Sequence, residues 1–284
     1  LGVRLLSQFR RHSMFSNFVD PYKCVKGKST KARDWSDDQF TAALEASLAQ
    51  FREKRVRGVW FQVDIQDSRF IQILVAHGFI FHHAKPQYVM MSSWLVEGEP
   101  STLPHYPHMY IGCGGLVVDA QNRVLLMREA RGFYLGWKFP GGLADPNESL
   151  LHTASREVLE ETGVETEGVA ILSFRQVPYG KWVDTNDIYF VCVMRPKDEN
   201  KKEVAPCPHE AADARWFTRE EIAALPEEEF HASLRKQLSD YDDWKAQGCR
   251  GLTMTTLDSP FKEDQQLYMF AVDYAPLDTV TPRL

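Results

Sequence analysis

The chain of 284 residues has few cysteines, no long apolar run and no excess of basic side chains. Its five cysteines are odd in number and widely spaced, and no two form a Cys-x-x-Cys pair, so neither a disulfide framework nor a zinc site is indicated. No apolar run approaches the roughly 18 residues that span a bilayer. The formal net charge of -6 argues against a broad nucleic-acid-binding surface. We therefore expect reduced thiols, no membrane contact and a cytoplasmic location, with mitochondrial and nuclear locations as alternatives.

Acidic side chains are absent from the first fourteen residues, LGVRLLSQFRRHSM, which hold three arginines and two serines. This composition resembles part of a mitochondrial presequence, and a basic, partly disordered leader is the simpler alternative. We assign residues 1–18 to a leader of either kind.

Three prolines and a glycine, with few residues that form a core, mark residues 96–108 as a linker. It separates a first domain over residues 19–95 from a second over residues 109–250, and residues 251–284 form a C-terminal extension. The sequence contains no internal repeat.

Hydrophobic spacing in the first domain predicts a small α/β domain. A helix over residues 36–54 begins at Ser36 with a capping-box pattern, and a second helix over residues 68–77 is closed by Gly78. Strands are predicted over residues 58–65, 79–82 and 88–95.

The second domain alternates strands and helices in an order that favours an α/β/α sandwich. Strands are predicted over residues 110–118 and 123–127, joined by a turn, and then over residues 169–176, 187–194 and 215–217. Helices are predicted from about Glu148 to Gly163, over residues 218–225 and over residues 230–246.

The run from Gly142 to Val164, GLADPNESLLHTASREVLEETGV, carries most of the chemistry. On a helix, Glu157, Glu160 and Glu161 share one face, because they stand at i, i+3 and i+4. Three like charges on one face repel unless a cation lies among them, and carboxylate oxygens suit a hard divalent cation. We therefore predict a Mg²⁺ site, with Mn²⁺ as the alternative metal.

Residues around these acids have predicted roles as well. The planar guanidinium of Arg156 suits a carboxylate, and we expect it to orient Glu148 or Glu160. Gly141 and Gly142 would let the backbone turn sharply and approach the metal closely.

The whole run resembles the signature of the Nudix family, Gly-x5-Glu-x7-Arg-Glu-U-x-Glu-Glu-x-Gly-U with U an aliphatic residue. Every fixed position is filled, by Gly142, Glu148, Arg156, Glu157, Val158, Glu160, Glu161, Gly163 and Val164. The resemblance implies hydrolysis of a nucleoside diphosphate linked to another moiety, with Glu157, Glu160 and Glu161 as metal ligands.

Proton removal from the attacking water needs a base, for which Glu160 and Glu210 are the candidates. Some members of the family supply a glutamate from a loop before a strand that contains tryptophan. Glu210 lies six residues before Trp216 and fits that place, and Glu203 is its competitor.

Residues 59–84 look like the pre-Nudix domain of the fibroblast growth factor antisense-type Nudix proteins, and plant ADP-ribose/NADH pyrophosphatase-type proteins carry a similar segment. In that group the first domain resembles half of an acetyltransferase fold. The segment from Trp137 to Leu143 is also similar to that group, and we expect Trp137, Phe139, Gly141 and Gly142 to contact the substrate.

These patterns predict Mg²⁺-dependent cleavage of a phosphoanhydride, with ADP-ribose and NADH as the leading substrates. The downstream tract of dedicated NADH pyrophosphatases is absent, so the substrate stays open. The alternatives are an RNA cap or dinucleoside-polyphosphate hydrolase, and a binding or regulatory protein with a weak hydrolase site. The expected partner is a nucleotide-derived small molecule, and a homodimer is one expected oligomeric state.

Overall fold

The computed structural model describes residues 14–107, 109–177, 185–248, 252–258 and 266–272, and it divides the chain into two compact units, residues 1–107 and 108–284. The predicted leader falls largely on residues 1–13, outside the described residues. Among the described helices, none combines the length and the apolar composition that crossing a membrane requires.

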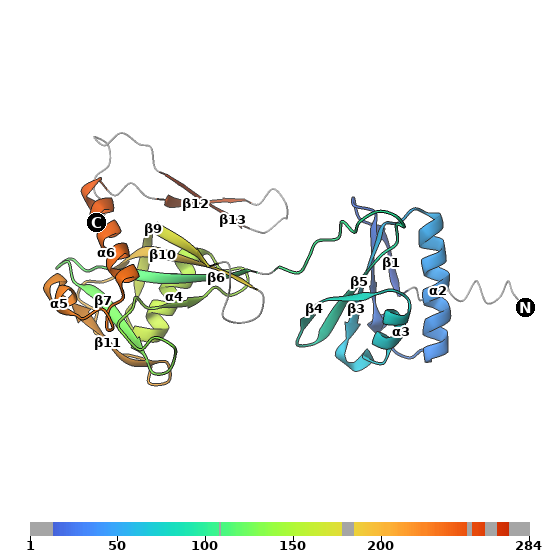
Figure 1. The fold of residues 1–284 in the computed structure, drawn as a ribbon, viewed down its shortest axis with the longest axis horizontal. Helices are drawn as coiled ribbons and strands as arrows, with labels where there is room; N and C mark the ends of the chain where they lie inside the picture. Colours follow the sequence, from blue (N-terminus) through green and yellow to red (C-terminus); the bar gives the residue numbers. More distant parts are fainter. Residues whose placement is uncertain (1–13, 108, 178–184, 249–251, 259–265, 273–284) are drawn as a thin grey trace, which may run out of the picture. The chain divides into compact units, whose positions relative to one another are not determined.

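The first unit is a five-stranded sheet in the order β1-β2-β3-β5-β4, with helices packed on it (Figure 1). Its strands are β1 (Phe15–Val19), β2 (Cys24–Lys28), β3 (Gly58–Asp64), β4 (Ile80–Lys85) and β5 (Tyr88–Trp94), and its α-helices are α2 (Asp37–Glu53) and α3 (Phe70–Ala76). Short 3-10 turns cover Ser29–Ala32 and Ile65–Asp67.

The core of this unit lies between the two helices and one face of the sheet. Phe40 of α2 stacks on Phe70 of α3 with ring centroids 3.9 Å apart, and Phe40 also meets Phe61 of β3 edge to face. All three rings are fully buried. Helix α2 starts as predicted, because Ser36 and Gln39 form a complete capping box.

Strand β1 corrects the boundary predicted for the leader. Residues 15–18, assigned to the leader from composition, pair with β2 in the first sheet. The physical reason is Phe15, which is 4% exposed and lies 5.0 Å from the ring of Phe51 at the end of α2. The basic composition of this segment did not indicate that Phe15 and Met14 are buried in the core.

The second unit has a six-stranded sheet in the order β13-β12-β9-β10-β6-β8 and a separate pair, β11-β7. Its strands are β6 (Met109–Val117), β7 (Val124–Glu129), β8 (Gly141–Leu143), β9 (Thr166–Val177), β10 (Asn186–Pro196), β11 (Ala211–Phe217), β12 (Leu252–Asp258) and β13 (Gln266–Val272). Its helices are α4 (Leu150–Thr162), α5 (Arg219–Ala224) and α6 (Ala232–Ala246).

Successive residues of β10 show how helices cover both faces of this sheet. Val191 and Val193 belong to a core with Leu238 and Tyr241 of α6. Cys192 and Met194 belong to another core with Leu151, Ala154 and Val158 of α4. Because side chains alternate across a strand, α6 and α4 lie on opposite faces, which confirms the predicted α/β/α sandwich (Figure 1).

The predicted turn after β6 is confirmed, since the Asn122 N–H donates to the Asp119 carbonyl at 2.9 Å. The two strands nevertheless enter different sheets, with a bridge between Val118 and Val124. Residues 252–258 and 266–272, predicted to lie in a C-terminal extension, form β12 and β13, and β12 joins the main sheet through Leu252 and Ile171. Pairing between distant segments decides both points.

Candidate active site

Helix α4 holds the acidic residues, and its two ends are fixed by local chemistry. The side chain of Ser149 accepts a hydrogen bond from the backbone N–H of His152 at the N-terminus. At the C-terminus, Gly163 has φ +75°, a left-handed conformation that glycine adopts without a steric penalty. The inner face of the helix buries Leu151, Ala154 and Val158, and Glu161 is buried as well, whereas Glu160 is exposed.

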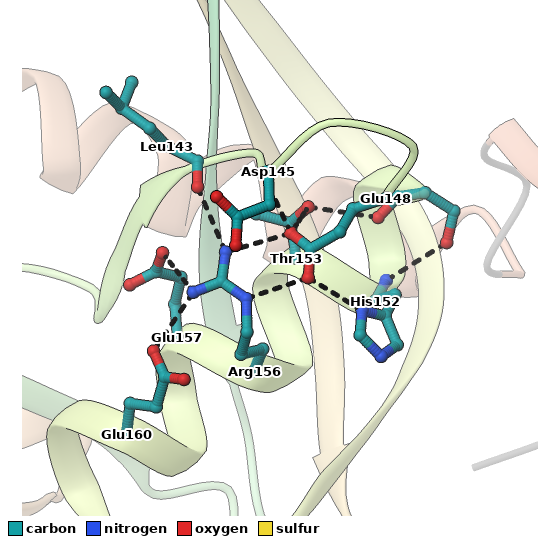
Figure 2. Close-up of polar contacts among 9 residues, drawn as sticks. Leu143, Asp145, Glu148, His152, Thr153, Arg156, Glu157 and Glu160 are labelled. Carbon is teal, nitrogen blue, oxygen red and sulfur yellow. Dashed lines mark hydrogen bonds and ion pairs between the residues drawn. The ribbon is translucent and has the colours of Figure 1, made fainter. Parts of the chain in front are cut away.

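Arg156 is the centre of the polar network on α4 (Figure 2). Its Nε and Nη2 donate to the two carboxylate oxygens of Glu148 at 2.8 and 2.9 Å. Its Nη1 donates to Glu157 at 2.8 Å and to Glu160 at 3.0 Å, and Nη2 also donates to the Leu143 carbonyl at 3.1 Å. The predicted partners, Glu148 or Glu160, are both present, and Glu157 is a third.

Glu148 is held as a carboxylate by several donors. Besides Arg156, the hydroxyl of Thr153 donates to it at 3.0 Å and the backbone N–H of Asp145 donates at 3.1 Å (Figure 2). The hydrogen bonds from Arg156 are the main cause that lowers the pKa of Glu148 to about 2, against the opposing effect of burial. Glu148 therefore anchors the loop before α4 to the helix.

Glu157 and Glu161 are the two acids of this helix that lie deepest. Burial raises the pKa of Glu161 to about 7, although Lys138 and the backbone N–H of Gly141 favour its charged form. That N–H donates to Glu161 at 2.6 Å. Burial also raises the pKa of Glu157, Arg156 opposes this, and the negative charges of Glu160 and Glu210 add to it.

A cavity of about 500 Å³ opens beside these side chains. Gly141, Gly142 and Leu143 of β8 form one part of its wall. The rest of the wall consists of five acids, two arginines and a histidine: Glu129, Asp145, Glu157, Glu161, Glu210, Arg131, Arg156 and His209. Glu210 lies in the turn that precedes β11. Neither Glu160 nor Glu203 lines this cavity.

The donor chemistry of the cavity fits a hard divalent cation, because Glu157, Glu161 and Glu210 all offer carboxylate oxygens. Across the described residues, however, no three acids, histidines or cysteines converge on one point as metal ligands do. Arg156 holds Glu157 and Glu160, and these ion pairs offset the repulsion that a cation would otherwise relieve.

Gly142 lies close to the carboxyl group of Glu157. A β-carbon at residue 142 would lie 2.7 Å from that group, so a larger residue there would force the Glu157 side chain to shift. Gly141 and Gly142 both line the cavity, and their predicted approach to a metal stays a prediction.

Trp137 and Phe139 correct the predicted contacts with substrate. Each side chain is only 3% exposed and belongs to the core under α6. The Trp137 ring packs against Phe217, and the guanidinium carbons of Arg128 and Arg215 lie 4.6 and 5.2 Å from its centroid. Both aromatic residues lie in the core next to the loop that carries Gly141, and neither lines the cavity.

Several residues of this site received no role from the sequence. Glu129, Asp145 and His209 line the cavity, and Lys138 pairs with Glu129 at 2.5 Å beside Glu161. Asp145 occupies a variable position of the signature, and Glu129 and Lys138 meet through the pairing of Met127 with Lys138. Only His209, next to Glu210, had a signal in the sequence.

The model of the Nudix hydrolase domain matches residues 15–95, and the model of the NUDIX domain matches residues 110–238. The chain is 31% identical to Nudix hydrolase 2 of Arabidopsis thaliana over 90% of this chain and 91% of that protein. It is 37% identical to nucleoside diphosphate-linked moiety X motif 6 of Mus musculus over 65% of this chain and 58% of that protein.

The chain spans only 50% to 62% of the length of several such relatives. Among solved structures, a NUDIX hydrolase from Nitrosomonas europaea is similar with 20% identity and a TM-score of 0.41, covering 60% of this chain and 88% of that one.

Proposed function

This chain belongs to the Nudix hydrolase family, and on that premise we propose that it hydrolyses a phosphoanhydride bond in a nucleoside diphosphate derivative. The observation that carries the proposal is the cavity of about 500 Å³ that Glu157, Glu161 and Glu210 line together with Arg156. Such a concentration of carboxylates would repel a diphosphate without a cation, so the proposal includes a divalent metal, Mg²⁺ first and Mn²⁺ second.

Glu157 and Glu161, which line the cavity, would hold the metal in this proposal together with Glu160, which lies outside the cavity lining and is paired with Arg156. When bound, a divalent cation polarises a phosphoryl oxygen and lowers the pKa of bound water. Arg156 keeps Glu157 and Glu160 in place through hydrogen bonds of 2.8 and 3.0 Å. The 2.6 Å hydrogen bond from the Gly141 N–H aims one oxygen of Glu161 at the loop and leaves the other for a ligand.

Glu210 is the proposed base that takes a proton from the attacking water. It lines the cavity with Glu157 and Glu161, whereas Glu160 does not line it and its side chain is 52% exposed. The backbone of Glu210 is fixed because its carbonyl accepts from the Ala130 N–H at 2.9 Å. These contacts favour Glu210 over Glu160 for proton transfer.

ADP-ribose and NADH remain the proposed substrates, and the fibroblast growth factor antisense-type subfamily remains the proposed subfamily. Support for the subfamily comes from the first unit, where a Nudix hydrolase model covers residues 15–95 in addition to the match over the second unit. A homodimer and a cytoplasmic location also stay predictions.

A substrate panel with Mg²⁺ or Mn²⁺ tests the proposal. The panel contains ADP-ribose, NADH, a capped RNA and a dinucleoside polyphosphate, and the products identify the bond that is cut. We expect AMP from ADP-ribose or NADH. Glu161→Gln and Glu210→Gln should each lower kcat by roughly 10²-fold or more.

Glu203→Gln is the matched control, because Glu203 is an exposed acid of the same segment that does not line the cavity. Its kcat should equal that of the native chain. Preferred turnover of the capped RNA or the dinucleoside polyphosphate would replace the proposed substrates. No turnover of any diphosphate, with tight binding of a partner instead, would favour a binding or regulatory protein.

A further inference from the structure

Two long cationic side chains of the first unit stand on backbone that favours glycine. Lys23 has φ +61° and Arg55 has φ +57°. The other non-glycine residues with positive φ in the described part of the chain are Asn122 and Asn147. Asparagine tolerates the left-handed region because its short side chain bonds locally, whereas lysine and arginine have no such advantage.

The fold itself requires the left-handed conformation at both positions. Arg55 follows the last turn of α2, where a left-handed glycine commonly ends a helix. Lys23 closes the tight turn between β1 and β2, in which its N–H donates to the Asp20 carbonyl at 2.9 Å. Glycine would satisfy either turn without strain, so the backbone does not explain the choice of a cation.

Both side chains line the same cavity, which has a volume of about 460 Å³. The N–H of Arg57 donates to the Lys23 carbonyl at 2.8 Å and so joins the two segments. Arg52, in the last turn of α2, is a further cation in the wall. The cavity also has an apolar part, formed by Val56, Leu95 and Val96.

Positive charge exceeds negative charge in this wall. Its two acids are Glu97 and Glu99, and Glu99 is already paired with Arg57 at 2.8 Å. The side chains of Lys23, Arg52 and Arg55 make no hydrogen bond or ion pair with any acid in the described residues. This occurs in a chain whose formal net charge is -6.

The dipole of α2 accounts for part of this arrangement, because cations are favoured at the C-terminus of a helix. It accounts for Arg52 and Arg55, which end that helix, but Lys23 comes from a turn between strands. A helix dipole also gives no reason to place a long side chain on left-handed backbone. All three side chains are exposed, and a ligand with negative charge would give them a common partner.

We propose that this cavity of the first unit binds a phosphate-bearing small molecule. Arginine presents several N–H donors that match phosphate oxygens, and lysine adds a compact charge. A volume of about 460 Å³ falls within the range of small-molecule sites. Three cations without acidic partners match a diphosphate, which carries several charges, better than a single carboxylate.

Titration calorimetry with inorganic pyrophosphate tests the proposal on the full chain at low ionic strength. EDTA in the buffer removes divalent metal, so the carboxylates of the second unit repel the anion. The native chain is expected to bind, and Lys23→Gly and Arg55→Gly should each weaken binding by about tenfold or more. Because glycine relieves the left-handed strain, both variants should melt at the native temperature or above.

Lys28→Gln is the matched control, since it removes one exposed cation of β2 that does not line the cavity. Its affinity for pyrophosphate should equal that of the native chain. Equal weakening by Lys28→Gln would show unspecific attraction and overturn the proposal. The proposal is also overturned if the native chain does not bind pyrophosphate, or if it binds a single-stranded RNA but not pyrophosphate. A lower melting temperature of the glycine variants would likewise overturn it.

Discussion

Arg156 makes five hydrogen bonds, and a guanidinium group has five N–H donors. All of its bonding capacity is therefore used within the loop and helix that carry the acids. The sequence indicated that Arg156 pairs with a glutamate of the signature, because the spacing allows it. That three glutamates share it depends on the loop path through Leu143, which spacing alone does not define.

Arg156→Ala is expected to lower the free energy of unfolding of the second unit by about 2 kcal/mol. The change leaves Glu148 and Glu157, whose side chains are 13% and 14% exposed, without their cation. Urea unfolding at neutral pH measures the loss. Lys197→Ala is the control, because Lys197 and Glu165 form an exposed pair at 3.6 Å, and it should change the free energy by less than about 0.5 kcal/mol. Equal losses in the two variants would contradict this role of Arg156.

Glu148 should make the stability of the second unit depend on acid pH. Its pKa is lowered from 4.5 to about 2 in the folded chain, chiefly by Arg156. A lowered pKa means that the stabilisation is complete above the unfolded value and is lost as the pH falls from 4.5 toward 2. Between pH 6 and pH 3 the native chain should lose about 2 kcal/mol more than Glu148→Gln does. An equal fall in the free energy of unfolding of both chains between pH 6 and pH 3, measured by urea unfolding, would exclude the effect.

The burial of single side chains could not be predicted from the sequence. Trp137 and Phe139 were expected at the substrate because they stand beside Gly141, yet both are 3% exposed. An aromatic side chain next to a functional glycine reads the same in the sequence whether it faces the cavity or the core. Only the packing of Phe217 and Phe230 against these rings decides between the two.

At the level of elements, the ends of helices were predictable because capping is local. The stop of α4 at Gly163 and of α3 near Gly78 needs only a residue that tolerates positive φ. Sheet membership was not predictable in the same way. The strands β6 and β7 are neighbours in sequence, but β7 pairs with β11, which lies far along the chain.

Gly78 and Gly163 provide a matched pair for helix termination. Both have positive φ, +83° and +75°, but a β-carbon at residue 78 would meet nothing within 4 Å, whereas one at residue 163 would lie 3.1 Å from Ala205. Gly78→Ala should cost about 1 kcal/mol of stability from backbone strain alone. Gly163→Ala should cost about 2 kcal/mol, because strain and crowding add.

Chemical unfolding of the two variants checks this order, with hydrogen exchange in α3 and in α4 as the probe for each unit. A smaller loss for Gly163→Ala than for Gly78→Ala would show that the segment around Ala205 moves aside at little cost.

For the whole molecule, the two units have separate cores. The core of the first unit contains only residues between Met14 and Leu95, and those of the second begin at Cys113. Phe40→Ala should therefore destabilise the first unit by about 3 to 5 kcal/mol. Hydrogen exchange should speed up in α2 and β3 while the protection of α4 and the proposed hydrolase activity stay unchanged. Loss of protection in α4 as well would show that the units unfold together.

The parallel pairing of β6 with β10 has a consequence for the chain as it leaves the ribosome. Every strand of the first sheet lies within residues 15–94, so that sheet can close while the rest is still being made. Strand β6 must wait for Asn186, where its long parallel neighbour begins, since its other neighbour β8 is only three residues long. If translation stopped before Asn186, the released chain would therefore have a folded first unit, but its helix α4 would have no completed sheet to pack on.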